Sequence, residues 1–330
     1  MDFAQRLERA WYRRPIRLLW LLWPLEILYR TVVALRRKRL QRRAKPQQTT
    51  VIVVGNITVG GTGKTPLVIA LVRWLQAEGY KPGVISRGYG GEAPYYPFVV
   101  TASGRPEQTG DEPLLIASSA DCPVVIGPDR VAALAEIERR FGCDVVISDD
   151  GLQHYALRRH IEIAVVDGVR GFGNGHCLPM GPLREPARRV EEVDLLVING
   201  ESALSWRRPY SEMQLEPAKP VNLLSGKSVD IAEFEGRVHA VAGIGNPRRF
   251  FTTLLELGLS PIAHPFPDHH RFTEADLRFE GDFPLVMTEK DAVKCRAFAT
   301  DTMWFLPVQA ALPASFYTSL KRKLKNLSEE

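Results

Sequence analysis

The chain has 330 residues, 45% of them apolar and 25% charged, so it is long enough to bury a sizeable core and has the composition of a globular protein. Its net charge of +5 is unevenly spread: residues 1–45 carry 13 Lys and Arg against three acids, and the rest of the chain is net negative. A nucleic-acid enzyme more often spreads basic charge over its catalytic body, so this distribution argues against that class and indicates a basic attachment segment.

The segment 1–45 combines this basic charge with an interrupted apolar run. The run Leu18–Leu25 is followed by Glu26 and Arg30, which leaves it too short for a membrane-spanning helix. Aromatic and cationic side chains around a broken apolar helix suit a bilayer interface with anionic head groups, so we predict an amphipathic membrane-associating helix. The alternative is a helix packed on the protein's own core. Three of the six tryptophans lie in this segment, namely Trp11, Trp20 and Trp23.

Residues 55–66 read GNITVGGTGKTP and follow the apolar run Val51–Val54, which predicts a strand, a glycine-rich phosphate-binding turn and a helix. In such a turn backbone N–H groups and the helix N-terminus face an anion, Lys64 reaches the terminal phosphates and Thr65 ligates Mg²⁺. Thr58 stands where the common pattern has its first glycine. We therefore expect a nucleoside triphosphate with Mg²⁺, bound by the loop residues Thr58, Val59, Gly60, Gly61, Thr62, Gly63, Lys64 and Thr65.

Beyond residue 50, short apolar runs alternate with helical stretches, which predicts an α/β fold with a mostly parallel sheet, like that of P-loop NTPases. We expect a P-loop core over 46–222 and a second, smaller α/β domain over 223–330. The helices are expected at Thr65–Glu78 and Asp129–Phe141. The predicted strands are Val51–Val54, Gly83–Ser86, Phe98–Thr101, Val124–Ile126, Val145–Ser148, Ile161–Val166 and Leu195–Asn199.

Two motifs place a pair of acidic residues at the boundary of a predicted strand or helix. VVISDDGLQH places Asp149 and Asp150 at the carboxyl end of a buried strand, where acids of P-loop enzymes hold Mg²⁺. TGDEPLLIA places Asp111 and Glu112 before a helical run, either as ordinary helix-capping acids or with Asp111 accepting a proton from an attacking hydroxyl.

Two further motifs leave alternatives open. HPFPDHHRFT gathers His264, His269 and His270 beside Asp268, either as metal ligands or as an Asp–His pair that tunes a catalytic base. GPLREPARR contributes Arg184 and Glu185, a cation and an acid suited to phosphate and to Mg²⁺. The four cysteines are far apart and fit a reducing compartment.

Together these motifs resemble the tetraacyldisaccharide 4'-kinase (lipid A 4'-kinase) family. The landmarks, which run from the N-terminal segment to about residue 295, are GNITVGGTGKTP, SRGYGG (86–91), GDEP (110–113), DDGLQH (149–154), GPLREP (181–186), FPDHH (266–270) and TEKDAVK (288–294). Because the family's loop has this form, the Thr at position 58 agrees with the resemblance.

The resemblance implies an ATP-dependent kinase that phosphorylates the 4'-hydroxyl of a tetraacyldisaccharide 1-phosphate, at the cytoplasmic face of the inner membrane of Gram-negative bacteria. It implies that Asp111 is the general base with His269 as its partner, that Lys64 keeps its P-loop role, and that Arg184 contacts phosphate. Arg87 and Tyr89 of SRGYGG are implied to contact the lipid head group or the nucleotide. The acids implied for the Mg²⁺ site, together with Thr65, are Asp149, Asp150 and Glu185.

The main alternative is a membrane-recruited regulatory P-loop ATPase or GTPase. A GTPase would carry an N/T-K-x-D motif, and in TEKD the lysine, Lys290, stands one position too late. A non-catalytic adaptor that binds nucleotide is a third class. Neither alternative explains Asp111 together with the Asp268–His269–His270 loop.

Overall fold

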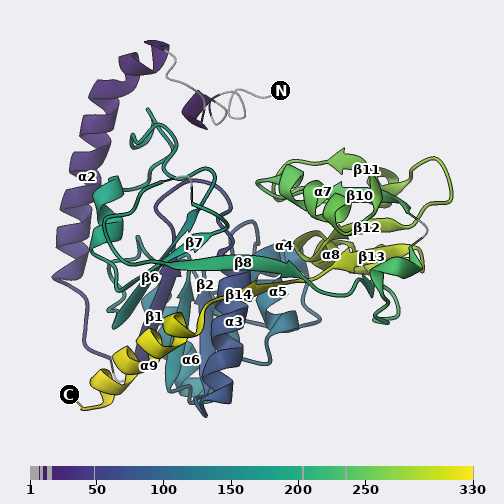
Figure 1. Ribbon diagram of the computed structural model, residues 1–330. Coiled ribbons are helices and arrows are strands. Elements are labelled where there is room, and N and C mark those ends of the chain that lie inside the picture. The colour runs from purple at the N-terminus through teal and green to yellow at the C-terminus, as the bar shows by residue number, and fades with distance from the viewer. Residues whose placement is uncertain are drawn as a thin grey trace.

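The computed structural model describes residues 7, 10–12, 17–47, 49–202, 204–234 and 236–329, and it confirms the predicted α/β class. Each of two sheets in the described chain forms the centre of its own body (Figure 1). We call the body around the first sheet the large body and the one around the second sheet the small body. A long helix, α2 (Trp23–Gln41), stands at the opposite side of the large body from the small body.

The large sheet runs in the order β14-β8-β7-β6-β1-β5-β2-β4-β3 and is parallel except at its two edges, where β3 and β14 pair antiparallel. Because the central strands point the same way, the loops after β1, β5, β6 and β7 meet at one edge, where α/β proteins bind ligands. The strands are β1 Thr50–Gly55, β2 Pro82–Ser86, β3 Phe98–Val100, β4 Val124–Ile126, β5 Val145–Asp149, β6 Ile161–Asp167, β7 Leu195–Asn199, β8 Ser211–Pro217 and β14 Val308–Ala311.

Helices cover both faces of this sheet, which is why its strands read as continuous apolar runs. Residues 51–54 of β1 are fully buried. One face packs against α3, α5 and α9, and the other packs against α6 and the loops around residues 152–198. The helices of the large body are α3 Lys64–Ala77, α4 Pro106–Thr109, α5 Asp111–Ser119, α6 Arg130–Phe141, the short η2 Ala187–Glu191 and α9 Ala314–Glu329.

The small sheet repeats this plan on a smaller scale. Its order is β11-β10-β12-β13-β9, parallel except for the β13–β9 pair. The strands are β9 Val221–Asn222, β10 Arg237–Ala242, β11 Ser260–Pro265, β12 Leu285–Thr288 and β13 Met303–Leu306. The helical segments are η3 Ile231–Glu233, α7 Pro247–Glu256, η4 Glu274–Leu277, α8 Glu289–Cys295 and η5 Arg296–Phe298.

The predicted division at residue 222 needs correction at both ends of the small body. β9 already belongs to the small sheet, whereas β14 and α9 return to the large body. The return has a clear physical cause, because Phe316, Leu320 and Leu324 recur at four-residue spacing on one face of α9 and are buried in the large core. Each such side chain contributes about 1.5–3 kcal/mol on burial. The small body is thus inserted between two parts of the large one.

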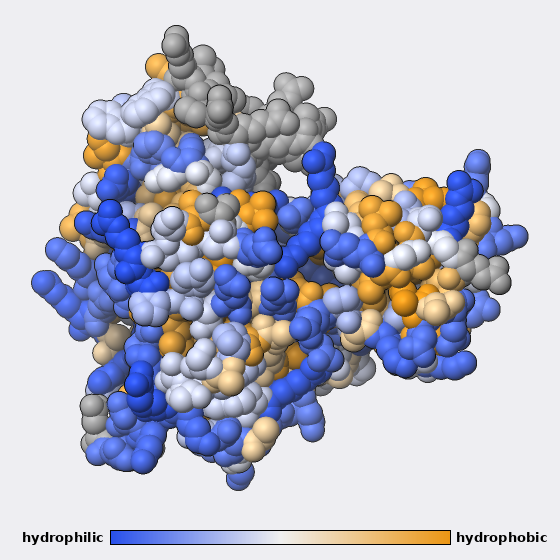
Figure 2. Space-filling model, viewed as in Figure 1, coloured by the Kyte–Doolittle hydropathy of each residue, from blue (hydrophilic) through white to orange (hydrophobic). Residues whose placement is uncertain are grey.

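Helix α2 has an apolar face that is exposed. Leu25, Leu28, Val32 and Leu35 recur at three- and four-residue spacing and are each 51–63% exposed. Figure 2 shows hydrophobic atoms at the edge of the molecule where Figure 1 places this helix. No helix in the described ranges has the length and hydropathy of a membrane span. Of the predicted segment 1–45, residues 1–6, 8–9 and 13–16 lie outside the described residues.

Candidate active site

The glycine-rich loop between β1 and α3 is held in place from both sides. Asn56 accepts a hydrogen bond from Lys64 Nζ at 3.2 Å, and Asn199 Nδ2 donates to Thr62 O at 3.0 Å. Gly63, the N-cap residue just before α3, has a φ of +85°, and an added Cβ there would collide with Asn199. Only glycine fits both the left-handed backbone and that close approach. These contacts within the protein define the shape of the loop.

Thr58, at the position of the missing glycine, is 4% exposed. Its backbone forms a bridge with Leu183, and its hydroxyl accepts from Asn56 Nδ2 at 3.3 Å. Thr58 is not among the described residues with positive φ, so this position makes no demand for glycine. The departure from the common pattern is thus explained by the contact between the loop and the GPLREP segment.

Asp149 and Asp150 lie at the end of β5, beside this loop, as the sequence predicts. Asp149 is 1% exposed; its Oδ2 accepts from Ser86 at 3.3 Å, while its Oδ1 has no hydrogen-bond partner among the described residues. Burial raises the pKa of Asp149. An orphaned carboxylate oxygen at this edge suits a hard cation, because oxygen ligands are those that Mg²⁺ prefers.

Asp150 differs from its neighbour because two cations face it. Lys64 Nζ lies 3.4 Å from its carboxylate and Arg184 Nη1 lies 2.9 Å from it. Burial alone would raise the pKa of Asp150, but these two cations outweigh it and hold the pKa well below its ordinary range. Its φ of +47° is rare for a residue with a side chain.

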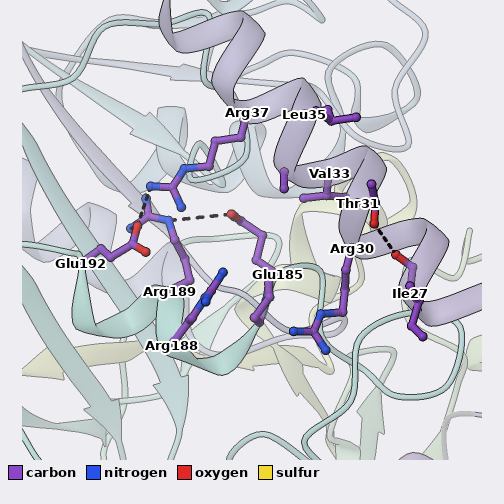
Figure 3. A pocket seen from close by; sticks show the side chains of 12 residues that line it. Ile27, Arg30, Thr31, Val33, Leu35, Arg37, Glu185, Arg188, Arg189 and Glu192 are labelled. Atoms are coloured by element: carbon purple, nitrogen blue, oxygen red, sulfur yellow. Dashed lines mark hydrogen bonds and ion pairs between the residues drawn. The ribbon is translucent and has the colours of Figure 1, made fainter. Parts of the chain in front are cut away.

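Both carboxylate oxygens of Glu185 accept hydrogen bonds from protein side chains. Its Oε1 accepts from Gln153 at 2.9 Å and its Oε2 accepts from the Tyr155 hydroxyl at 2.5 Å. Arg189 Nε lies 3.8 Å away, and Glu185 faces a groove of about 440 Å³ between α2 and η2 (Figure 3). Both carboxylate oxygens of Glu185 have protein donors, as do both of Asp150, so Asp149, with its orphaned Oδ1, is the acid of the three whose surroundings best suit a metal.

Asp111 and His269 are brought together although 158 residues separate them in the chain. His269 Nδ1 lies 2.9 Å from Asp111 Oδ2 and 3.1 Å from Oδ1. The bond to Asp111 raises the pKa of His269. For Asp111, burial opposes ionisation, but the bond from His269 and the charge of Lys290 outweigh burial and lower its pKa.

The structure also distinguishes the two histidines of the FPDHH loop. His270 packs between Phe266 and Phe272, and its Nε2 lies 3.4 Å from Asp276. Only His269 reaches Asp111, and it does so with a φ of +59°. The described residues contain no group of three or more His, Cys, Asp or Glu side chains placed to hold a metal.

Two hollows lie near this pair. A cleft between the bodies, seen as a depression in Figure 2, is lined by the glycine-rich loop on one side and by the loop after β10 and the start of α8 on the other. A second cavity, of about 470 Å³, is lined by Asp111, His269, Tyr89, Arg271 and Lys294. Asp111 and His269 line the cavity, while Glu112 and Asp268, their neighbours in sequence, line the cleft. The pair therefore lies close to both hollows.

Sequence reasoning missed several residues of the cleft. Arg249 Nη2 donates to Asn199 at 3.0 Å, and Lys290 contacts Glu112 and Asp268. The motif TEKDAVK was the available signal for Lys290, but nothing in the local sequence shows which side chains its lysine faces. Arg249 follows a strand-to-helix turn that carries no recognisable phosphate-binding pattern.

Comparisons with known proteins are consistent along the whole chain. A family model described as tetraacyldisaccharide-1-P 4'-kinase matches residues 18–325. The tetraacyldisaccharide 4'-kinase of Hahella chejuensis is 47% identical over 329 residues, covering 97% of this chain and 96% of that protein; the one of Nitrosococcus oceani is 48% identical over 320 residues, covering 96% and 93%. The crystal structure of LpxK from Aquifex aeolicus in complex with ATP matches with a TM-score of 0.79 and 26% identity, covering 93% of this chain and 99% of that one.

Proposed function

The chain belongs to the tetraacyldisaccharide-1-P 4'-kinase family, and on this premise we propose that it transfers the γ-phosphate of ATP to the 4'-hydroxyl of a tetraacyldisaccharide 1-phosphate, a lipid A precursor. The hydroxyl oxygen attacks the γ-phosphorus, the bond to the β–γ bridging oxygen breaks, and ADP leaves. The proton of the hydroxyl passes to the Asp111–His269 pair. The products are ADP and the 4'-phosphorylated lipid.

The observation that carries this proposal is the Asp111–His269 pair, which lines the cavity while its sequence neighbours Glu112 and Asp268 line the cleft. A free carboxylate is a weak base toward an alcohol, and a histidine bonded to it both orients it and shares the proton. The pair joins the two bodies, so closure of the small body over ATP would complete the site. The cavity beside the pair is the proposed acceptor site, with Tyr89 at its mouth.

The large body supplies the proposed phosphate and metal groups. Lys64 and the backbone of the loop 58–65 would bind the β- and γ-phosphates, and Arg184 would contact phosphate beside Asp150. Thr65, Asp149 and Asp150 would hold Mg²⁺, which neutralises phosphate charge in such reactions. The orphaned Oδ1 of Asp149 supports this set, whereas the paired oxygens of Glu185 favour a structural role for it.

The membrane surface is the proposed partner of α2. Its outer face exposes Leu25, Leu28, Val32 and Leu35, while its inner face is fixed to the large body. Glu26 accepts from Cys177 N at 2.9 Å, and the Tyr29 hydroxyl donates to Arg184 O at 3.0 Å. A helix with an exposed apolar stripe and a basic C-terminal end would lie in the interface of an anionic membrane. The proposed location is the cytoplasmic face of the bacterial inner membrane, where such an acceptor and ATP meet.

The activity is tested by transfer of radiolabel from γ-labelled ATP to a tetraacyldisaccharide 1-phosphate in mixed micelles with Mg²⁺. Wild type is compared with Asp111→Ala and Lys64→Ala, and the matched controls are Asp282→Ala and Lys227→Ala on the exposed surface of the small body. We expect labelled lipid from wild type and both controls, and almost none from the two site variants. ATP hydrolysis without lipid labelling would overturn the proposal in favour of a regulatory ATPase.

Membrane binding is tested separately, by co-sedimentation with vesicles of anionic phospholipid. We expect Leu28→Glu combined with Leu35→Glu to release the protein from the vesicles. Leu255→Glu, at a leucine 59% exposed on the small body, is the matched control and should bind as wild type does. Equal binding of all three proteins would contradict the assignment of α2 to the membrane.

A further inference from the structure

The TEKDAVK segment forms the junction between β12 and α8 and lies beside the active site. Thr288 caps α8 by accepting from Asp291 N at 3.2 Å. Asp291, which is fully buried, accepts from Gly243 N at 2.8 Å and pairs with Lys294 Nζ at 2.6 Å. These contacts fix the first turn of α8 within the small body.

Two side chains of this turn cross to the large body. Glu289 accepts from the Ser119 hydroxyl at 3.0 Å, at the end of α5. Lys290 reaches the beginning of α5, where its Nζ donates to Glu112 Oε1 at 3.0 Å and lies 3.7 Å from Asp111 Oδ2. The same Nζ lies 3.2 Å from Asp268 Oδ1, on the loop that carries His269. Helix α8 is thus tied to both ends of the helix that begins with the proposed base.

The environment of Lys290 is unusual in its charge. Its side chain is 17% exposed and faces three carboxylates, those of Asp111, Glu112 and Asp268. An ammonium group has three hydrogens and no acceptor; Lys290 donates to Glu112 and Asp268, and Asp111 lies at ion-pair distance. Lys64 is different, because its partners Asn56 and Asp150 lie in the phosphate-binding loop and beside it. Lys290 therefore serves the acids of the site rather than a phosphate group.

The position of the cluster gives this charge a consequence for catalysis. Glu112, Asp268 and Lys290 line the same cleft as the glycine-rich loop. Three carboxylates without a cation would repel a triphosphate and one another, and such repulsion is strong where water is partly excluded. A single lysine that contacts all three acids removes much of that repulsion, and it does so only when the two bodies are together.

We propose that Lys290 is a positioning residue, which joins the small body to α5, holds Asp111 in line with His269 and neutralises the acids that border the nucleotide cleft. The inference rests on the proposed function, because it concerns the same site. Its acid partners come from both bodies: Asp111 and Glu112 from α5, and Asp268 from the loop after β11. The nearby cations that also act on Asp111 are His269 and Lys294.

The expected kinetic effect follows from geometry and charge together. Without Lys290, Asp111 loses a partner that fixes its position, and misplacement of a reacting group by about 1 Å costs about 100-fold in rate. The charge of Lys290 also lowers the pKa of Asp111, so its removal raises that pKa. Since Asp111 acts in its ionised form, the acid limb of the kcat/KM profile moves to higher pH.

The experiment compares wild type with Lys290→Met, Lys290→Arg and the surface control Lys227→Met in the lipid-labelling assay across pH. We expect Lys290→Met to lower kcat about 100-fold and to shift the acid limb upward. Lys290→Arg keeps the charge, so its acid limb should stay at the wild-type position, and its kcat should exceed that of Lys290→Met. Thermal unfolding of each variant is measured in parallel.

The outcomes separate this inference from the proposed function. Wild type without lipid kinase activity would defeat the proposed function itself. Active wild type with a Lys290→Met variant within threefold of its kcat would overturn the role of Lys290 alone. If Lys290→Met is active but has a lower Tm than wild type, an acid limb at the wild-type pH would overturn the inference, because Lys290 would then have only a structural role. If Lys290→Met does not fold, Lys290→Arg carries the test, and a shifted acid limb in that variant overturns the inference.

Discussion

The two bodies share one plan but contribute to the site in different ways. Each has a sheet that is parallel at its centre and antiparallel at an edge. The large body contributes a glycine-rich loop, a helix N-terminus and the acids at the end of β5. The small body offers side chains that extend from short loops, above all His269 and Lys290. The proposed phosphate site thus lies within one body, whereas the Asp111–His269 pair forms only when both bodies are in contact.

The two bodies also differ in the contacts that hold their positive-φ residues in place. Asp150 in the large body and His269 in the small body are the two non-glycine residues with positive φ among those described. Such conformations are costly and persist where surrounding contacts hold them. Asp150 is held by Lys64 and Arg184 of its own body, but His269 is held by Asp111 of the other. Variants that remove one contribution at a time can therefore separate nucleotide binding from catalysis.

The largest effect is expected from Asp111→Asn, which keeps the shape of the side chain and removes its basicity. General-base catalysis contributes about 10²–10⁴-fold, so kcat should fall within that range. The dissociation constant of ATP, measured by titration calorimetry, should change little because the phosphate-binding loop is complete without Asp111. Asp282→Asn serves as the surface control. A large loss of ATP affinity in Asp111→Asn would show that the two functions are not divided as described.

A smaller effect is expected from substitutions of the acids considered for the proposed Mg²⁺ site. Asp150→Asn suits the positive φ at that position and should raise the Mg²⁺ concentration for half-maximal activity about tenfold or more. Glu185→Gln should leave that concentration near wild type. It should instead lower the free energy of unfolding by about 1–3 kcal/mol, because Tyr155 and Arg189 are buried around it. Equal shifts in Mg²⁺ requirement for both variants would restore Glu185 to the metal site.

The smallest effect concerns the contact between the bodies. His269 has a raised pKa, so its stabilising contribution is complete below its unfolded pKa of about 6.5 and is lost as pH rises through the folded value. Asp111 has a lowered pKa, so its contribution is present above about 3.9 and is lost as pH falls through the folded value. The charged pair is therefore present near pH 6 and is lost as the pH rises through the folded pKa of His269.

His269→Asn removes this ion pair and again suits the local backbone. The difference in Tm between wild type and the variant should be larger at pH 6 than at pH 9, and it should correspond to about 1 kcal/mol or less because His269 is partly exposed. Differential scanning calorimetry at the two pH values provides the measurement. A difference that grows toward pH 9 would contradict the assigned charge states.

The sequence by itself determined the α/β class, the central strands, the glycine-rich turn before α3 and the position of the acids at the end of β5, because these depend on short-range patterns of apolar residues, glycine and charge. The family resemblance pointed to Asp111 and His269, but composition left Asp111 divided between capping and catalysis. Tertiary structure decided that Asp111 meets His269, that Lys290 faces three carboxylates, and that Glu185 binds Tyr155 and Gln153. It also decided that α9 returns to the large core. Each of these depends on which distant side chains packing brings within a few ångströms, and no local pattern records that.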